Sequence, residues 1–392
     1  MSHIIFSIMP MFVCLFWVII LLIDKQNSNL SKRFLSFFLS ISIINYFVHA
    51  LYFNHQYELY TFFDSIWCFT SLAGYPLYYY YIRLLTKDTR IEWKWIWLII
   101  PSLSLALFSA IIFILMSQAE LDTFIHGVMY HKPEYETDYT PLVRLQMLRL
   151  TLFRVIFIPQ VILVLFFGLK LIIAYNAKIK DFYSNTGGKD LTPIKWLLIF
   201  FVLASAISLI SSAVGKDYFV THPWLLAIPS VTHSLYLFGL GYFGYKQRFT
   251  IEDFQKDLNQ PAEEAEVETE SEQIQLPKNF ETQCAQLIEL LKKDEIFTNP
   301  DLRITDLAAV LNTNRTYASR LCNEYFHTNF ADLINRFRTE KAKELMLAGA
   351  DGELTLDDIM VMSGFASESS FYRSFKKETG MSPGDFRKSV RN

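Results

Sequence analysis

Long apolar runs dominate the first two-thirds of this 392-residue chain, and they constrain its fold more than any other feature. A membrane-spanning helix needs roughly 20 predominantly apolar residues, because its backbone must be hydrogen-bonded internally while its side chains face lipid. The segments that meet this requirement are Ile4–Ile23, Phe34–Phe53, Phe62–Ile82, Trp95–Met116, Leu150–Tyr175, Trp196–Val214 and Pro223–Tyr245. The sequence therefore predicts a seven-span membrane domain over residues 1–249.

The distribution of Lys and Arg between the connections predicts how these helices are oriented. One set, made of Asp24–Arg33, Arg83–Lys94, Asn176–Lys195 and the segment after Tyr245, holds 13 Lys and Arg. The alternate set holds only 4. Because cytoplasmic loops carry the excess of these residues, we expect the N-terminus outside and the C-terminus in the cytoplasm. A multi-pass protein of the cytoplasmic (inner) membrane, with the lipid bilayer as a partner, is the predicted outcome.

Several polar side chains lie inside the predicted spans, where ionisable groups are costly and often functional. They are Asn45, His49, Asp64, Arg154, Gln160 and His233. Hydrogen bonds between helices are the commoner use of such groups, and we expect that use here.

The sequence contains no arrangement that is typical of an enzyme or a metal site. The four cysteines, Cys14, Cys68, Cys284 and Cys322, form no CxxC pair or Cys/His cluster, so we expect them to be reduced and structural. We also find no nucleophile–base pair and no Gly-rich phosphate loop, so no catalytic residue, metal or cofactor is predicted.

A compositional change separates the apolar part from a polar C-terminal part. The run AEEAEVETESEQ, Ala262–Gln273, has six Glu and no Lys or Arg. Such a composition predicts a disordered acidic linker over residues 250–279. Apolar residues at helical spacing in Phe280–Leu291 then open a soluble domain, residues 280–392. This apolar stripe beside a tether also suggests a homodimer.

Ile304–Phe326 has the pattern of a helix-turn-helix unit. Ile304, Leu307 and Leu311 lie on one face of a first helix, and Asn314 is a good N-cap for a second. We expect that second helix to bury Ala318, Leu321, Cys322 and Tyr325. The opposite stripe is Thr316, Ser319, Arg320 and Asn323, which are side chains of the types that read base edges in a major groove.

The same plan recurs in residues 356–379. A helix is followed by the turn Gly364–Ala366, by Ser367 as N-cap, and by a second helix that ends at Gly380. The exposed stripe of this helix is Ser369, Tyr372, Arg373 and Lys376. Between the units, residues 329–349 predict a connecting helix that spaces the two recognition helices for successive major grooves.

The segment GFASESSFYRSFKKETGMSPGDFRK, residues 364–388, resembles the signature region of the AraC/XylS family of bacterial transcription regulators. Phe326–Leu347 resembles that family's connecting helix, and the resemblance covers roughly residues 285–391. It implies that one helix of each unit reads double-stranded promoter DNA. The residues implied are Asn314, Arg315, Thr316, Ser319, Arg320 and Asn323 in the first unit, and Ser367, Glu368, Ser369, Ser370, Tyr372 and Arg373 in the second. Arg320 and Arg373 are the expected guanine contacts, and Lys376, Lys377, Arg387 and Lys388 the expected phosphate contacts.

The expected architecture is thus all-α, with a seven-helix membrane domain followed by a cytoplasmic domain of two helix-turn-helix units. It resembles that of membrane-embedded bacterial sensor regulators, in which a small-molecule or membrane cue controls promoter binding. RNA polymerase is a further partner that this interpretation allows. The alternative is a membrane receptor or transporter whose cytoplasmic tail binds a protein partner.

Overall fold

The computed structural model describes residues 2–24, 29–132, 135, 139–214, 216–259, 280–348 and 354–391. Every regular element within these ranges is a helix, so the predicted all-α class is confirmed. The chain divides into two compact units. The first comprises Met1–Ile173 and Leu191–Glu252, and the second comprises Ala174–Asp190 and Asp253–Asn392.

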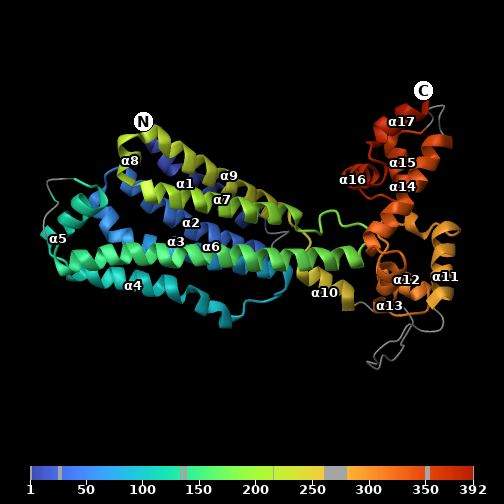
Figure 1. The fold of residues 1–392 in the computed structure, drawn as a ribbon, viewed down its shortest axis with the longest axis horizontal. Helices are drawn as coiled ribbons and strands as arrows, with labels where there is room; N and C mark the ends of the chain where they lie inside the picture. The colour runs from blue at the N-terminus through green and yellow to red at the C-terminus, as the bar shows by residue number, and fades with distance from the viewer. Residues whose placement is uncertain are drawn as a thin grey trace. The chain divides into compact units, whose positions relative to one another are not determined.

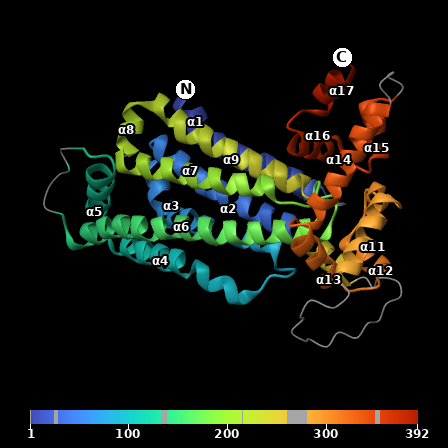
Figure 2. The same ribbon diagram turned by 45° about the vertical axis from the view of Figure 1, so that its right-hand side comes forward.

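The first unit is a bundle of long helices. In Figures 1 and 2, α1, α2, α3, α6, α7 and α9 run side by side. The elements of this unit are α1 (Ser2–Ile23), α2 (Leu30–Phe53), α3 (Tyr57–Thr86), η1 (Trp93–Ile99), α4 (Ile100–Leu115), α5 (Gln118–Asp122), η2 (Thr123–Met129), α6 (Pro141–Phe182, to residue 173), α7 (Thr192–Val214), α8 (Lys216–Thr221), η4 (Pro223–Leu226) and α9 (Ala227–Lys246).

Six helical stretches among the described residues are long and apolar enough to cross a membrane. They are Ile4–Ile23, Leu30–Phe53, Trp93–Leu115, Pro141–Phe182, Thr192–Val214 and Trp224–Asn259. The third predicted span forms the 30-residue helix α3, which is not among them. This helix is rich in Tyr, and most of its residues after Trp67 are buried by the rest of the bundle. A helix covered by protein needs a less apolar surface than one facing lipid. The seventh span therefore stays a prediction.

Polar side chains inside the bundle bond to one another between helices. Arg149 Nη2 on α6 lies 2.6 Å from Asp64 Oδ2 on α3, and both side chains are fully buried. The Tyr60 hydroxyl donates to Asp64 Oδ1 at 2.7 Å, and Arg149 Nε donates to Gln146 Oε1 at 3.0 Å. Gln146 in turn donates to the Ser109 carbonyl oxygen on α4 at 3.1 Å. This network ties α3, α4 and α6 together.

The second unit contains the two predicted helix-turn-helix units. Its elements are α10 (Ile251–Asn259), α11 (Phe280–Lys292), η5 (Ile296–Thr298), α12 (Ile304–Val310), α13 (Arg315–Arg320), η6 (Leu321–Tyr325), α14 (Phe330–Ala348), α15 (Leu356–Met362), α16 (Glu368–Thr379) and α17 (Pro383–Arg391). In both ribbon views α14 lies between α12 and α13, which form the first helix-turn-helix unit, and α15–α17, which contain the second (Figures 1 and 2).

Helix α10 corrects one expectation, since residues 251–259 were predicted to belong to a disordered linker. Ile251, Phe254 and Leu258 recur at helical spacing, and Ile251 and Phe254 are buried. The ring of Phe254 packs 5.4 Å from that of Phe182. The linker prediction rested on the acidic run Ala262–Gln273 and overlooked this apolar stripe. That run lies outside the described residues.

Residues 174–190 belong to the same compact unit as the helix-turn-helix domain. The Ser184 amide donates to the Leu302 carbonyl oxygen at 3.1 Å, and Tyr183 forms an isolated antiparallel bridge with Arg303. The Tyr183 hydroxyl donates to Asp257 on α10 at 2.5 Å. The last residues of α6 and the segment after it are thereby joined to the start of α12.

Candidate nucleic-acid interface

The first helix-turn-helix unit is closed by the turn between α12 and α13. Asn312 adopts a positive φ of 49°, a backbone conformation that Asn tolerates better than most residues. Asn314 caps α13, because its side chain accepts a hydrogen bond from the Tyr317 amide at 2.9 Å. The predicted capping role of Asn314 is confirmed, and it leaves this side chain half-buried at the start of the recognition helix.

The second half of this recognition helix is π-helical. Ala318, Leu321 and Cys322 are fully buried as predicted, but Tyr325 is 45% exposed, which contradicts the prediction. The prediction assumed 3.6 residues per turn throughout. A π turn closes i→i+5 bonds, so it turns less per residue and shifts Tyr325 away from the core.

The exposed face of α13 carries most of the predicted reading residues. Arg315, Thr316 and Asn323 are exposed, whereas Ser319 and Arg320 are half-buried. Arg320 Nε lies 2.9 Å from Glu324 Oε1, one turn further along, and this hydrogen bond raises the pKa of Arg320. This i,i+4 pair lies on the helix surface, where such pairs are weak, so Arg320 stays available for the predicted guanine contact.

The second unit depends on Gly364. Its φ is +85°, and a Cβ placed there would lie 2.6 Å from the Phe297 carbonyl oxygen. Glycine is needed here because the backbone has a positive φ and because there is no room for a Cβ. The turn of the second helix-turn-helix unit thus packs directly on η5. Ile359, Phe365, Phe371 and Phe375 form the buried core behind this turn, together with Ala342 and Met346 of α14.

Helix α16 presents the second predicted reading face. The side chains exposed on this helix are Glu368, Ser369, Tyr372, Arg373, Lys376, Lys377 and Glu378. Ser367 caps the helix, since its hydroxyl accepts from the Ser370 amide. Ser370 itself is buried, and its hydroxyl donates to the Ser367 carbonyl oxygen at 2.8 Å. The structure therefore places Ser370 in the cap and not on the exposed face.

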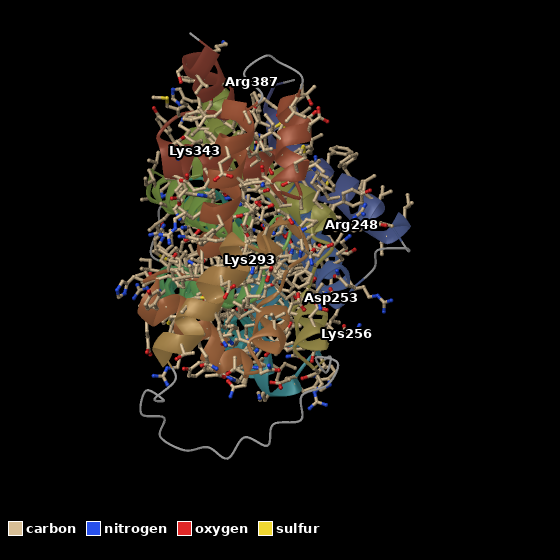
Figure 3. All side chains as sticks on the ribbon, turned by 90° about the vertical axis from the view of Figure 1, so that its right-hand side faces the viewer. Arg248, Asp253, Lys256, Lys293, Lys343 and Arg387 are labelled. Atoms are coloured by element: carbon tan, nitrogen blue, oxygen red, sulfur yellow. The ribbon has the colours of Figure 1, made fainter. Side chains whose placement is uncertain are left out.

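Two of the four predicted phosphate contacts, Lys377 and Arg387, have partners within the domain. Lys377 Nζ lies 2.9 Å from Asp332 Oδ2 on α14. Burial alone would raise the pKa of Asp332, but the hydrogen bond and charge of Lys377 outweigh it and lower that pKa. Arg387 on α17 is half-buried and donates to the Leu354 carbonyl oxygen, while Lys388 is exposed. Figure 3 labels Arg387 on α17, and Lys293 and Lys343 at other places on the second unit.

A residue that the sequence analysis did not single out holds the two units together. Arg338 of α14 is fully buried and donates from Nε to the Phe297 carbonyl oxygen at 2.7 Å. Its Nη2 donates to the Asn299 carbonyl oxygen at 2.7 Å and to Ser184 Oγ at 3.0 Å. Burial lowers the pKa of this guanidinium to about 10. The spacing of Ile334, Arg338 and Ala342 on one helix face is the signal that could have identified it.

The apolar stripe of α11 has a different role from the one expected. Cys284, Leu287 and Leu291 are almost fully buried against the chain's own domain, where α11 contacts η5 and η6. The stripe is therefore part of this domain's core, and it offers no support for a homodimer.

The described residues contain no group of three or more His, Cys, Asp or Glu that could hold a metal ion. The four cysteines are free and buried, as predicted. Burial raises the pKa of the Cys322 thiol to about 12, which keeps this thiol protonated and unreactive at neutral pH.

Comparison with known proteins supports the interpretation of the C-terminal part as a helix-turn-helix domain. Residues 307–389 match the family model described as a helix-turn-helix domain. The chain is 28% identical over 91 residues to the Msm operon regulatory protein of Streptococcus mutans, covering 23% of this chain and 32% of that protein. It is 31% identical over 87 residues to the melibiose operon regulatory protein of Escherichia coli K12, covering 22% and 28%. The match thus spans at most about a third of these relatives. The C-terminal domain is of the AraC type.

The search of solved structures found the C-terminal domain of AraT, a response regulator from Geobacillus stearothermophilus. It is 27% identical, with 30% of this chain and 88% of that chain covered, at a TM-score of 0.24.

Proposed function

We propose that this protein is a membrane-bound, sequence-specific DNA-binding transcription regulator that couples a signal sensed in or across the membrane to promoter binding. In this proposal the apolar bundle lies in a bacterial cytoplasmic membrane and the helix-turn-helix domain is in the cytoplasm. Promoter DNA is its main partner, and RNA polymerase and a second copy of the chain are further candidates. The single observation that carries the proposal is the pair of matched recognition faces, on α13 and α16, in one domain of AraC type.

The geometry of α14 supports binding of both faces to one DNA molecule. This helix contacts η5 and η6 of the first helix-turn-helix unit and α15, α16 and α17 of the second. Arg338 and Gly364 close the junction between the units through the backbone of η5. The two recognition helices therefore move as one body, which is what reading two adjacent major grooves requires.

The contacts of residues 174–190 support coupling to the bundle. Helix α6 runs without a break from Pro141 to Phe182, and its last residues belong to the unit that contains the helix-turn-helix domain. Ser184 bonds to Arg338, the residue that joins the two reading units. A movement of α6 would therefore act on Arg338, which sets the arrangement of the two helix-turn-helix units.

Mapping of DNA sites in cells by crosslinking and sequencing tests the proposal. We would compare the intact protein with Arg320→Ala/Arg373→Ala, and with the charge-matched control Arg336→Ala/Lys343→Ala. The control residues lie on α14 and are part of neither recognition helix (Figure 3 labels Lys343). Each bidentate Arg–guanine contact contributes about 1–3 kcal/mol of discrimination, so the first variant should lose at least about 30-fold in site occupancy.

Discrete sites that disappear in the first variant and persist in the control are the expected result. Sites unchanged in both variants would show that Arg320 and Arg373 do not read DNA. No sites under any growth condition, with all three proteins in the membrane, would reject the regulator and favour a receptor or transporter with a protein-binding tail.

A further inference from the structure

The helical bundle contains a partly open cavity of about 230 Å³ that the proposed function has not used. Helices α1, α6 and α9 line it with residues from their N-terminal halves, and α2 and α7 line it mainly with residues from their C-terminal halves. These parts lie toward one end of the bundle. In the predicted orientation, with the N-terminus outside, it is the outer half.

The wall of the cavity is strongly aromatic. Trp67 of α3 stacks on Phe153 of α6, with ring centroids 5.1 Å apart and an interplanar angle of 13°. Phe153 stacks on Phe157 one turn further along α6, and the Tyr75 ring meets Phe157 edge-on at 5.1 Å. All four side chains line the cavity. Aromatic walls of this kind favour a flat, apolar ligand body.

The charge of the lining is one-sided. Among the described residues of the lining, Arg154 alone has a fixed charge, and none is Asp or Glu. Within the residues that the structure describes, Arg154 makes one hydrogen bond, from Nη2 to the Ser212 carbonyl oxygen at 3.2 Å, and no ion pair. A guanidinium has five N–H donors arranged to bind a carboxylate at two points. Arg154 is exposed in the bundle and lies near the outer end of the predicted span Leu150–Tyr175, where a bound anion would offset the cost of an arginine without an anionic partner.

Two histidines, His49 and His233, line the cavity, and the hydrogen bonds of His233 are already made within the bundle. His233 Nδ1 lies 2.7 Å from the Pro229 carbonyl oxygen, which can only accept, so Nδ1 carries the proton of this bond. The Ser208 hydroxyl lies 3.1 Å from His233 Nε2. Arg154, whose charge does not depend on pH, is the group in the described lining best placed to select the charge of a ligand.

We propose that this cavity binds a small aromatic carboxylate, with its ring against Trp67 and Phe153 and its carboxylate on Arg154. A cavity of about 150 Å³ accommodates benzene, so the larger volume here fits one ring with a short acidic side chain. The inference deepens the proposed function, because such an anion would be the sensed signal. It rests on that function for the role of the ligand, but its binding is measurable without DNA.

Calorimetry on the purified full-length protein in lipid nanodiscs tests this assignment. The probes are phenylacetate, its neutral amide phenylacetamide, the cation 2-phenylethylamine, and octanoate as an aliphatic carboxylate. We expect phenylacetate to bind at least tenfold tighter than each of the others. Arg154→Gln should remove the preference over the amide. Arg144→Gln is the matched control, because Arg144 lies on the same helix, bonds to one backbone carbonyl oxygen at 2.9 Å, and does not line the cavity.

A second variant blocks the cavity without touching Arg154. Gly74 lines the cavity, and a Cβ placed there meets nothing within 4 Å, so Gly74→Leu should fold and abolish phenylacetate binding. Equal binding of acid and amide, unchanged binding in either cavity variant, tighter binding of octanoate, or no binding of any probe would overturn the assignment. Phenylacetate binding without DNA sites in cells would reject the regulator but leave this site standing. DNA sites in cells without phenylacetate binding would support the regulator and reject this ligand site.

Discussion

The buried pair between Asp64 on α3 and Arg149 on α6 allows a quantitative test of the bundle. The two groups lie 2.6 Å apart, and both side chains are fully buried. Removing one partner of such a pair leaves an uncompensated charge, which costs about 3–5 kcal/mol. We therefore expect Asp64→Asn or Arg149→Gln alone to destabilise the bundle by about this amount.

Replacing both partners with apolar residues should restore most of the stability. Such replacements are often neutral or stabilising by about 1–4 kcal/mol. In Asp64→Leu/Arg149→Met, however, Tyr60 Oη and Gln146 Oε1 each lose a partner, at about 1–3 kcal/mol per group. The two effects are opposite in sign and similar in size. The double variant should therefore lie within about 2 kcal/mol of the natural protein and above both single variants.

Thermal unfolding of the purified protein in detergent, followed by tryptophan fluorescence, measures these differences. For a domain of this size 1 kcal/mol shifts Tm by roughly 2–4 °C, so each single variant should lose about 10 °C. The control is Glu92→Gln/Lys94→Gln, which removes a 2.6 Å pair whose side chains are 30% and 67% exposed. An exposed pair is worth at most about 1 kcal/mol. If the double variant lost the sum of the two single losses, α3 and α6 would not be joined by this pair.

Three further predictions concern the DNA-binding domain. Gly364→Ala should abolish DNA binding in gel-shift assays, because the added Cβ would collide with the backbone of η5. Gly380→Ala is the control, since Gly380 also has a positive φ, +77°, but a Cβ there meets no atom within 4 Å. This control should lower the free energy of unfolding by only about 1 kcal/mol. Asp332→Asn should free Lys377, raise DNA affinity, and steepen the dependence of log K on log salt by about 0.9. Because the pKa of Asp332 is lowered in the folded domain, its pair with Lys377 stabilises the domain above about pH 4, and this contribution is lost as the pH falls through the folded-state pKa. Cys322 should resist iodoacetamide at pH 8 until the protein unfolds, as measured by mass spectrometry.

These three predictions have clear contrary outcomes. DNA binding by the Gly364 variant at natural affinity would show that the two units do not pack as described. An unchanged salt dependence in the Asp332 variant would mean that Lys377 contacts no phosphate. Rapid alkylation of Cys322 in the native protein would contradict its burial behind α13.

Local patterns were sufficient to predict the helix-turn-helix units. The caps Asn314 and Ser367, the glycine at 364 and the helical spacing of Phe371 and Phe375 each depend on residues close in sequence. The structure confirms these features because the same residues that favour each helix locally also form the shared core.

Other features depend on contacts between residues far apart in the sequence. The pairing of Asp64 with Arg149 and the bonds from Arg338 to Phe297 and Ser184 have no local signature. The exposure of Tyr325 follows from a π turn, whose i→i+5 bonds a 3.6-residue period cannot anticipate. The apolar runs in the sequence predicted the helices of the bundle. They did not predict which polar side chains would line one cavity.

The rigid connection through α14 also limits the promoters that one copy of this domain can recognise. Since α14 is 19 residues long and packs against both helix-turn-helix units, the distance between the two proposed reading helices is fixed by the protein and not by the DNA. A target site should consist of two short sequence boxes on the same face of the duplex. Inserting five base pairs between them would turn one box to the opposite face. Inserting ten would restore the phase but place it beyond reach, since ten pairs extend the duplex by about 34 Å.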